Sequence, residues 1–178
     1  MRTPSRTGSL PFRLLGLGLA AALCGACKTA PLPGSDDTPP AIDWFVRNTT
    51  TDAVLEFSGN GGPILVNPGD QFHVTCFARD PGGVSEISLT VNSQWSCFMD
   101  TFTESAIGDG APLVHQYEPD EDGEVPVEVF ILEDVGDLST LTCSPGYSFS
   151  GGGVTMVASA ENFHGGSAVG SLGFTRNY

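Results

Sequence analysis

Basic residues are scarce in this sequence, with seven Lys and Arg against 21 Asp and Glu in 178 residues. Three of the seven, Arg2, Arg6 and Arg13, lie at the front of the chain. After residue 26 the chain keeps four basic residues against all 21 acidic ones, a net charge of −17. Such a surface repels phosphate backbones and anionic lipid headgroups, which argues against a nucleic-acid partner and against membrane attachment by charge.

Motifs for catalysis and metal binding are also missing. None of the three histidines, His73, His115 and His164, belongs to an HExxH or HxH motif or to a Cys/His cluster at zinc spacing. Residues 146–150 (GYSFS) approach a nucleophile elbow, but Ser150 stands where that motif needs its second glycine. We therefore expect neither an enzyme nor a cofactor. A hydrolase whose Ser, His and Asp meet only on folding stays open as an alternative.

No stretch after residue 27 is long and apolar enough to cross a membrane. The one apolar run, residues 14–23 (LLGLGLAAAL), follows the basic front end and is too short for a stable transmembrane helix. Small residues, Gly25 and Ala26, come next. This order is typical of a secretory signal peptide, which we assign to residues 1–26.

The end of that segment, Leu23-Cys24-Gly25-Ala26-Cys27, resembles the lipobox of bacterial lipoproteins. In that family the cysteine after the cleavage site carries a diacylglycerol, which here implies lipidation of Cys27. Cys24 departs from the family pattern, which usually has leucine there. The resemblance implies a bacterial cell-envelope protein, held at the outer membrane or the cell surface by its lipid. Ordinary cleavage after Ala26 would instead give a secreted protein.

Residues 27–40 combine this anchor cysteine with a proline-rich tether. Residues 28–40 hold four prolines and no aromatic residue, and such tracts stay extended and unpacked. The apolar pattern starts at Ala41, so we assign residues 41–178 to one folded domain, whose length suits a single core.

From residue 41 onward, short apolar stretches are separated by turn residues, and no window has a helical period. Strands are predicted over residues 63–66, 72–78, 84–92, 125–132 and 154–160, and in a last strand that turns Leu172 and Phe174 inward. Turns are predicted at residues 67–70, where Gly69 suits a positive φ, at residues 80–83, and at the glycine-rich residues 161–167. The pattern predicts an all-β fold, an antiparallel β-sandwich in a single domain.

Two stretches resemble bacterial immunoglobulin-like and polycystic-kidney-disease-type surface domains. Residues 67–91 (NPGDQFHVTCFARDPGGVSEISLTV) are similar to the B and C strands of that family, and residues 153–176 (GVTMVASAENFHGGSAVGSLGFTR) to its F–G hairpin. The resemblance implies an immunoglobulin-like β-sandwich, and a shared fold alone identifies no activity. Residues 93–124 form an insert whose conformation the pattern does not predict.

The insert carries the candidate ligand contacts. Trp95, Phe98 and Phe102 offer rings that can stack on a ligand such as a sugar. The alternative for a tryptophan in a sandwich is a place in the core.

An acidic run at residues 118–124 (EPDEDGE) offers carboxylates to a divalent cation. Pro119 interrupts the run, and Val129 stands at the twelfth position, where an EF-hand needs a carboxylate. We expect a solvated loop and no metal site. A calcium-stabilised structural or spacer module remains the alternative.

Three cysteines remain after Cys27, and an odd number leaves one unpaired or bound to another chain. Cys76 lies mid-strand on the face that the alternation turns into the core. An immunoglobulin-type bridge from Cys76 needs a partner on the F strand, and residues 154–160 contain no cysteine. We predict a Cys97–Cys143 disulfide between two loop-like segments, with Cys76 as a buried thiol, in a compartment where disulfides persist.

The sequence as a whole predicts a non-enzymatic bacterial cell-envelope lipoprotein. Its work would be binding or adhesion to a protein or glycan ligand through the insert and the loops, because loops on a rigid scaffold carry function. We expect a monomer that meets the membrane only through its lipid.

Overall fold

The computed structural model describes residues 38–100, 102–138 and 142–176, without the side chains of Phe102, Ala106 and Asp109. The predicted signal peptide, Cys27 and the tether as far as residue 37 lie outside the described residues. The described part is built of β-strands and contains no α-helix, which confirms the all-β prediction. It likewise offers no helix long and apolar enough to cross a membrane.

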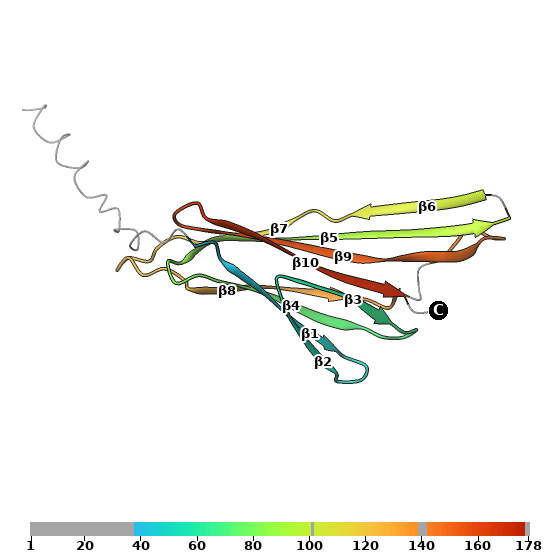
Figure 1. The fold of residues 1–178 in the computed structure, drawn as a ribbon, viewed down its shortest axis with the longest axis horizontal. Coiled ribbons are helices and arrows are strands. Elements are labelled where there is room, and N and C mark those ends of the chain that lie inside the picture. The colour runs from blue at the N-terminus through green and yellow to red at the C-terminus, as the bar shows by residue number, and fades with distance from the viewer. Residues whose placement is uncertain (1–37, 101, 139–141, 177–178) are drawn as a thin grey trace, which may run out of the picture. The chain divides into compact units, whose positions relative to one another are not determined.

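The strands of the described part form two sheets (Figure 1). In chain order they are β1 (Ala41–Asn48), β2 (Val54–Ser58), β3 (Asn60–Val66), β4 (Phe72–Arg79), β5 (Val84–Met99), β6 (Phe102–Asp109), β7 (Leu113–Gln116), β8 (Glu128–Val135), β9 (Ser148–Asn162) and β10 (Ser167–Arg176). The four-stranded sheet has the order β2-β1-β4-β8. The six-stranded sheet has the order β3-β10-β9-β5-β6, and β7 pairs with the first part of β5.

The alternation predicted for residues 72–78 is present in β4. Phe72, Val74, Cys76 and Ala78 are buried, and the residues between them face outward. The same period of two places Trp44 of the neighbouring strand β1 in the core. The ladders of this sheet are all antiparallel.

The prediction of a wholly antiparallel arrangement is wrong at one ladder. Strand β3 pairs with β10 in parallel. The chain leaves β2 in one sheet and enters β3 in the other across a single residue, Gly59, whose φ is +68°. Because β3 and β10 are not joined by a hairpin, no tight turn forces them to run in opposite directions.

The insert at residues 93–124 is largely regular. Strand β5 continues to Met99 instead of ending near residue 92, and β6 pairs back along its second half. In Figure 1 the far ends of β5, β6 and β9 extend beyond the four-stranded sheet. The eighth strand starts at Glu128, so Pro126 precedes it, which agrees with the expectation that a proline stands at the start of a strand.

The two sheets share one hydrophobic core. Trp44 and Val74 of the four-stranded sheet belong to the same buried cluster as Met156 and Phe174 of the six-stranded sheet. The rings of Phe72 and Phe174 meet across the sheets with centroids 5.3 Å apart. The buried indole N–H of Trp44 donates to the carbonyl oxygen of Gly59 at 2.8 Å, so its polar group is satisfied.

Two predicted turns meet at a buried polar contact. Asp80 opens the turn at residues 80–83, and Asn162 is the last residue of β9, where the predicted turn at residues 161–167 begins. Both are 1% exposed, and the side-chain N–H of Asn162 donates to Asp80 Oδ2 at 3.2 Å. The Asn162 Oδ1 also accepts from the backbone N–H groups of His164 and Gly166. The two stretches that resemble immunoglobulin-like domains are thus joined directly.

Candidate functional site

The cysteines pair as the sequence predicted. Cys97 and Cys143 form a disulfide, and Cys76 is a buried free thiol. Burial raises the pKa of the Cys76 thiol to about 12. The surroundings of Cys97 differ from the prediction, because it lies on β5 and not in a loop. The disulfide therefore ties the far end of β5 to the segment that leads into β9.

The three aromatic residues proposed as ligand contacts do not form one cluster. Trp95 and Phe98 both belong to β5, but odd and even residues of a strand face opposite sides of a sheet. Trp95 is half-buried, and Phe98 is 48% exposed. Phe102 lies at the start of β6, and its side chain is outside the described part.

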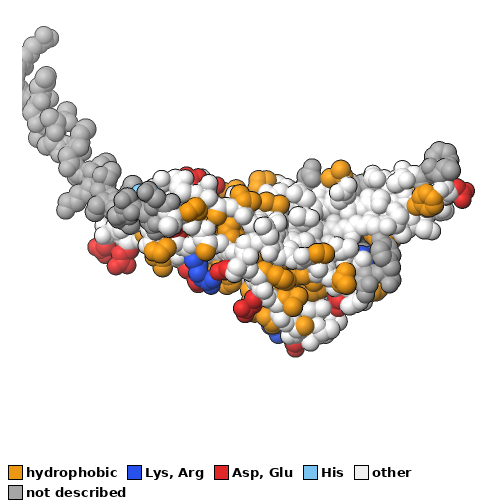
Figure 2. All heavy atoms as spheres, viewed as in Figure 1, with side chains coloured by type: hydrophobic (Ala, Val, Ile, Leu, Met, Phe, Trp, Pro, Cys, Tyr) orange, Lys and Arg blue, Asp and Glu red, His pale blue; other side chains and the backbone are white. Residues whose placement is uncertain are grey.

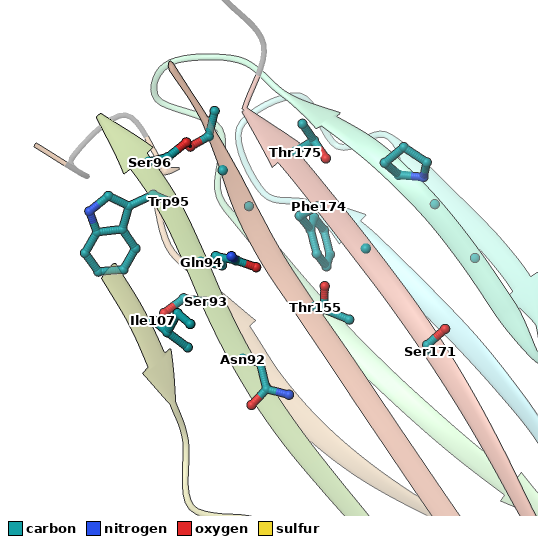
Figure 3. A pocket seen from close by; sticks show the side chains of 17 residues that line it. Asn92, Ser93, Gln94, Trp95, Ser96, Ile107, Thr155, Ser171, Phe174 and Thr175 are labelled. Atoms are coloured by element: carbon teal, nitrogen blue, oxygen red, sulfur yellow. The ribbon is translucent and has the colours of Figure 1, made fainter. Parts of the chain in front are cut away.

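A groove of about 840 Å³ lies on the six-stranded sheet (Figure 3). We call it the polar groove, and its central residues are Asn92 and Gln94 of β5, Thr155 of β9, Ser171 and Thr175 of β10, and Ile107 of β6. Figure 3 shows Ile107 and Trp95 on the β5–β6 side and Ser171 and Thr175 on the β10 side, with Gln94 and Thr155 between them.

Strand register explains which side chains line the polar groove. Two rows of residues cross β5, β9 and β10, Gln94, Gly153 and Thr175 in one row and Asn92, Thr155 and Gly173 in the next. Residues directly opposite in an antiparallel ladder share a face of the sheet. Each row contains one glycine, so each lacks one side chain, and the groove opens at these positions.

The two glycines of these rows have different structural roles. A Cβ on Gly153 would lie 1.9 Å from the carbonyl oxygen of Phe174, so the backbone there requires glycine. A Cβ on Gly173 would meet only the Cα of Pro63, at 3.8 Å, which is an ordinary contact. Glycine inside a strand costs about 0.5–1 kcal/mol relative to alanine. Gly173 lies where the register of the β3–β10 ladder shifts, has room for a Cβ, and leaves the groove open.

The polar side chains at the centre of the groove have free hydrogen-bonding groups. The amides of Asn92 and Gln94 and the hydroxyls of Thr155 and Thr175 make no side-chain hydrogen bond with another described residue. An amide side chain has both donors and acceptors, and a hydroxyl can be either. These four residues can therefore bond to a ligand without first breaking internal contacts.

The side chain of Asp109, the β6 partner of Asn92, lies outside the described part; none of the described residues that line the groove is Asp, Glu, Lys, Arg or His. This is unusual in a chain whose acidic residues outnumber its basic ones three to one. The nearby Arg176 lies on the opposite face of β10, with its guanidinium 4.6 Å from the centre of the Phe149 ring. In Figure 2 the surface over the far ends of β5, β6 and β9 is mostly white apart from its tip, which marks uncharged polar groups and backbone.

A second surface, the outer face of the four-stranded sheet, is apolar at its centre. It carries Phe45, Phe77, Phe130 and Leu132, and we call it the phenylalanine face. Phe130 is 51% exposed and Leu132 60% exposed. The rings of Phe77 and Phe130 are tilted by 50° with centroids 6.0 Å apart, so they do not form a flat platform.

Ion pairs surround the phenylalanine face. Arg79 bonds to Asp43 at 2.5 Å and also pairs with Glu128, and both contacts raise the pKa of its guanidinium, Glu128 most strongly. His73 contacts the carboxylate of Asp134. These five ionisable groups are therefore already paired within the domain.

The acidic loop at residues 118–124 uses one of its carboxylates for its own backbone. Asp120 Oδ1 accepts hydrogen bonds from the N–H groups of Asp122 at 3.0 Å and Glu124 at 2.8 Å. Within the described ranges, no group of three or more His, Cys, Asp or Glu is arranged to hold a metal ion.

Comparison with known proteins assigns no family. No family model and no curated protein matches the sequence. Among solved structures, the chain has a likeness to the sporulation control protein Spo0M from Bacillus subtilis, with 11% sequence identity and a TM-score of 0.33. The match covers 78% of this chain and 50% of Spo0M, so the chain spans about half the length of that protein. The likeness is too weak to support an inference about fold or function.

Proposed function

We propose that the chain is a bacterial cell-envelope lipoprotein whose domain is a non-enzymatic binding or adhesion module, with the polar groove as its binding site. The lipobox-like sequence at Cys27 supports the anchor. The common core of the two sheets supports an immunoglobulin-like sandwich, as does the contact between Asp80 and Asn162, which joins the two stretches that resemble that family.

The observation that carries this proposal is the chemistry of the polar groove. Its described lining offers amides and hydroxyls and contains no carboxylate, imidazole or amine. General acid–base catalysis needs a group whose pKa can be brought near the working pH. Amides and hydroxyls form specific hydrogen bonds with a ligand but do not supply such a group. Binding is therefore the function that this arrangement supports best.

The anchor is tested by metabolic labelling with a fatty-acid analogue. We expect label on the wild-type protein and none on Cys27→Ser, because the thiol of Cys27 is the acceptor. Equal labelling of both proteins, or of neither, would show that the chain is not lipidated at this residue.

The binding site is tested with isolated cell-envelope fractions and the exported chain carrying Cys27→Ser, which removes the contribution of the lipid. Gly173→Val adds a side chain in the groove, where a Cβ would make only an ordinary contact with Pro63, and valine suits a strand. We expect it to reduce envelope binding at least tenfold. The matched control is Gly136→Val, which adds the same side chain at a loop glycine with nothing within 4 Å of the new Cβ. Equal loss in both variants, or loss in neither, would remove the groove as the binding site.

A calcium-stabilised spacer module is the alternative with the sharpest test. A site filled to 100 times its dissociation constant would stabilise the fold by about 2.7 kcal/mol, which a melting curve resolves. We expect no shift with calcium, because Pro119 and Val129 break the ligand spacing of the acidic loop. A shift that disappears in a protein carrying both Asp120→Asn and Asp122→Asn would favour the spacer.

A further inference from the structure

We propose that the ligand of the polar groove is a neutral, hydroxyl-rich oligosaccharide. This inference rests on the proposed function, since it takes the groove to be the binding site, and it adds the chemical class of the ligand. Three properties of the groove lead to it: the absence of charged residues from its described lining, its free amides and hydroxyls, and its position over a sheet whose backbone is already paired.

Charge selects against ionic ligands. A bound anion or cation would lose its hydration without gaining a partner of opposite charge from the described lining, in which no residue is ionisable. The rest of the domain repels anions further, since the exported chain has a net charge of −17. A neutral ligand avoids both the loss of ionic hydration and the electrostatic repulsion.

The free polar groups match hydroxyls. Asn92, Gln94, Thr155 and Thr175 present donors and acceptors that no described residue uses. A sugar hydroxyl is at once a donor and an acceptor, so it can bond to any of them. A purely apolar ligand would instead leave these groups buried and unpaired, at a cost of about 1–3 kcal/mol for each one.

A peptide ligand fits this site less well. Extended peptides gain affinity mostly by adding a strand to a free sheet edge. The groove lies over the face of the sheet, where β5 is paired with β9, β9 with β10 and β10 with β3. The backbone below the groove is therefore occupied by ladder hydrogen bonds. Recognition has to come from side chains, and this suits a ligand that is itself rich in hydroxyls.

The dimensions and borders of the groove suit an oligosaccharide. Ile107 of β6 lines one side and Pro63 of β3 the other, and β5, β9 and β10 lie between them. Four strand spacings of about 4.8 Å give a width of about 19 Å, longer than one sugar ring. Ile107 is 67% exposed and, with Pro63, gives apolar surface against which the C–H faces of sugar rings can pack.

The test is a titration followed by nuclear magnetic resonance, with the exported chain carrying Cys27→Ser. The probes are neutral hexasaccharides of α-linked glucose, β-linked glucose and N-acetylglucosamine, and an anionic hexamer of galacturonic acid. We expect at least one neutral probe to shift the side-chain amide signals of Asn92 and Gln94, and the anionic probe to leave them unchanged. Gly173→Val and Gln94→Ala should each weaken binding at least tenfold, whereas Gly136→Val should bind like the wild type.

Several outcomes would overturn the inference. They are the absence of binding by every neutral probe, tighter binding of the anionic probe, shifts confined to residues outside the groove, and unchanged affinity in both groove variants. If the neutral probes fail while Gly173→Val still reduces binding to envelope fractions, the ligand class is wrong and the proposed function stands. If Gly173→Val affects neither the envelope binding nor the titration, both the proposed ligand class and the proposed binding site are wrong. A melting curve for each variant ensures that lost binding is not lost folding.

Discussion

Removal of the Cys97–Cys143 disulfide should cost the domain a large part of its stability. The two cysteines are 46 residues apart in the chain, and the closed loop contains β6, β7 and β8. In the chain-entropy model, a cross-link over a loop of this length stabilises the fold by about 4 kcal/mol. Since domains are typically stable by about 5–15 kcal/mol, a protein with Cys97→Ala and Cys143→Ala should still fold, but with a much smaller margin.

The expected loss can be measured by urea denaturation at pH 7, with melting as a second observable. A loss of about 4 kcal/mol corresponds to a fall of about 8–16 °C in melting temperature for a domain of this size. Wild-type protein treated with a reductant should unfold at the same urea concentration as the double variant, because both lack only the cross-link. Cys76→Ala serves as the control, since it removes a thiol from the core and keeps the disulfide.

Two results would refute this reasoning. A loss below about 1 kcal/mol in the double variant would mean that the loop is already held by its strand pairing, so the cross-link restricts little in the unfolded chain. A linked peptide containing Cys76 in a digest made without reductant would mean that the pairing itself is wrong.

Three further predictions concern single residues. The side-chain amide of Asn48 and other hydrogen bonds lower the pKa of Asp70, so its contribution to stability is present above the unfolded pKa and lost as the pH falls through the lower folded pKa. Asp70→Asn should therefore lower the free energy of unfolding at pH 7 and reduce the dependence of that free energy on pH in the acid range. An unchanged pH dependence would contradict this. Gly153→Ala should lower the melting temperature because its Cβ would lie 1.9 Å from a carbonyl oxygen, whereas Gly173→Ala should leave it equal or higher. The Cys76 thiol, whose pKa is raised to about 12 by burial, should react with an alkylating reagent only in denaturant, and fast labelling of the folded protein would count against its buried position.

The sequence predicted the strands whose two faces differ. Strand β4 buries every second residue, and the sequence shows the same period of two in its apolar residues. Strand β2 was missed because it lies at the edge of its sheet, and none of its five residues is buried. A strand with both faces in solvent has no alternation for a pattern search to find.

The far half of β5 was missed for a related reason. Up to Val91, the inward residues of β5 pack on the core. Beyond Val91, the strand extends past the four-stranded sheet (Figure 1), so its inward face no longer covers the core. Polar residues such as Ser93 therefore occupy the same face as Leu89. The apolar alternation therefore stops although the strand continues. Pairing with β6 and β9 maintains the extended backbone there.

The polar groove could not be predicted from the sequence, because its parts come from segments as far apart as Pro63 and Thr175 and meet only through register. Gln94 faces the groove beside Thr175 because both lie opposite Gly153, one on each side of β9. A slip of one residue in either ladder would turn the whole strand over and remove the arrangement. The family resemblance covers β9 and β10 but not residues 92–96, so it also gives no information on this pairing.

The structure distinguishes two glycines, Gly153 and Gly173, that the sequence does not distinguish. Gly153 and Gly173 are equivalent in the sequence, since Gly153 precedes the strand predicted over residues 154–160 and Gly173 lies in the last predicted strand, between Leu172 and Phe174. In the structure, Gly153 has no room for a side chain, so packing alone explains it, whereas Gly173 has room and leaves it empty. The missing side chain at such a position has a consequence for the surface around it. At Gly173 that consequence is an open groove lined by free amides and hydroxyls, so this residue is the one whose substitution best separates binding from folding.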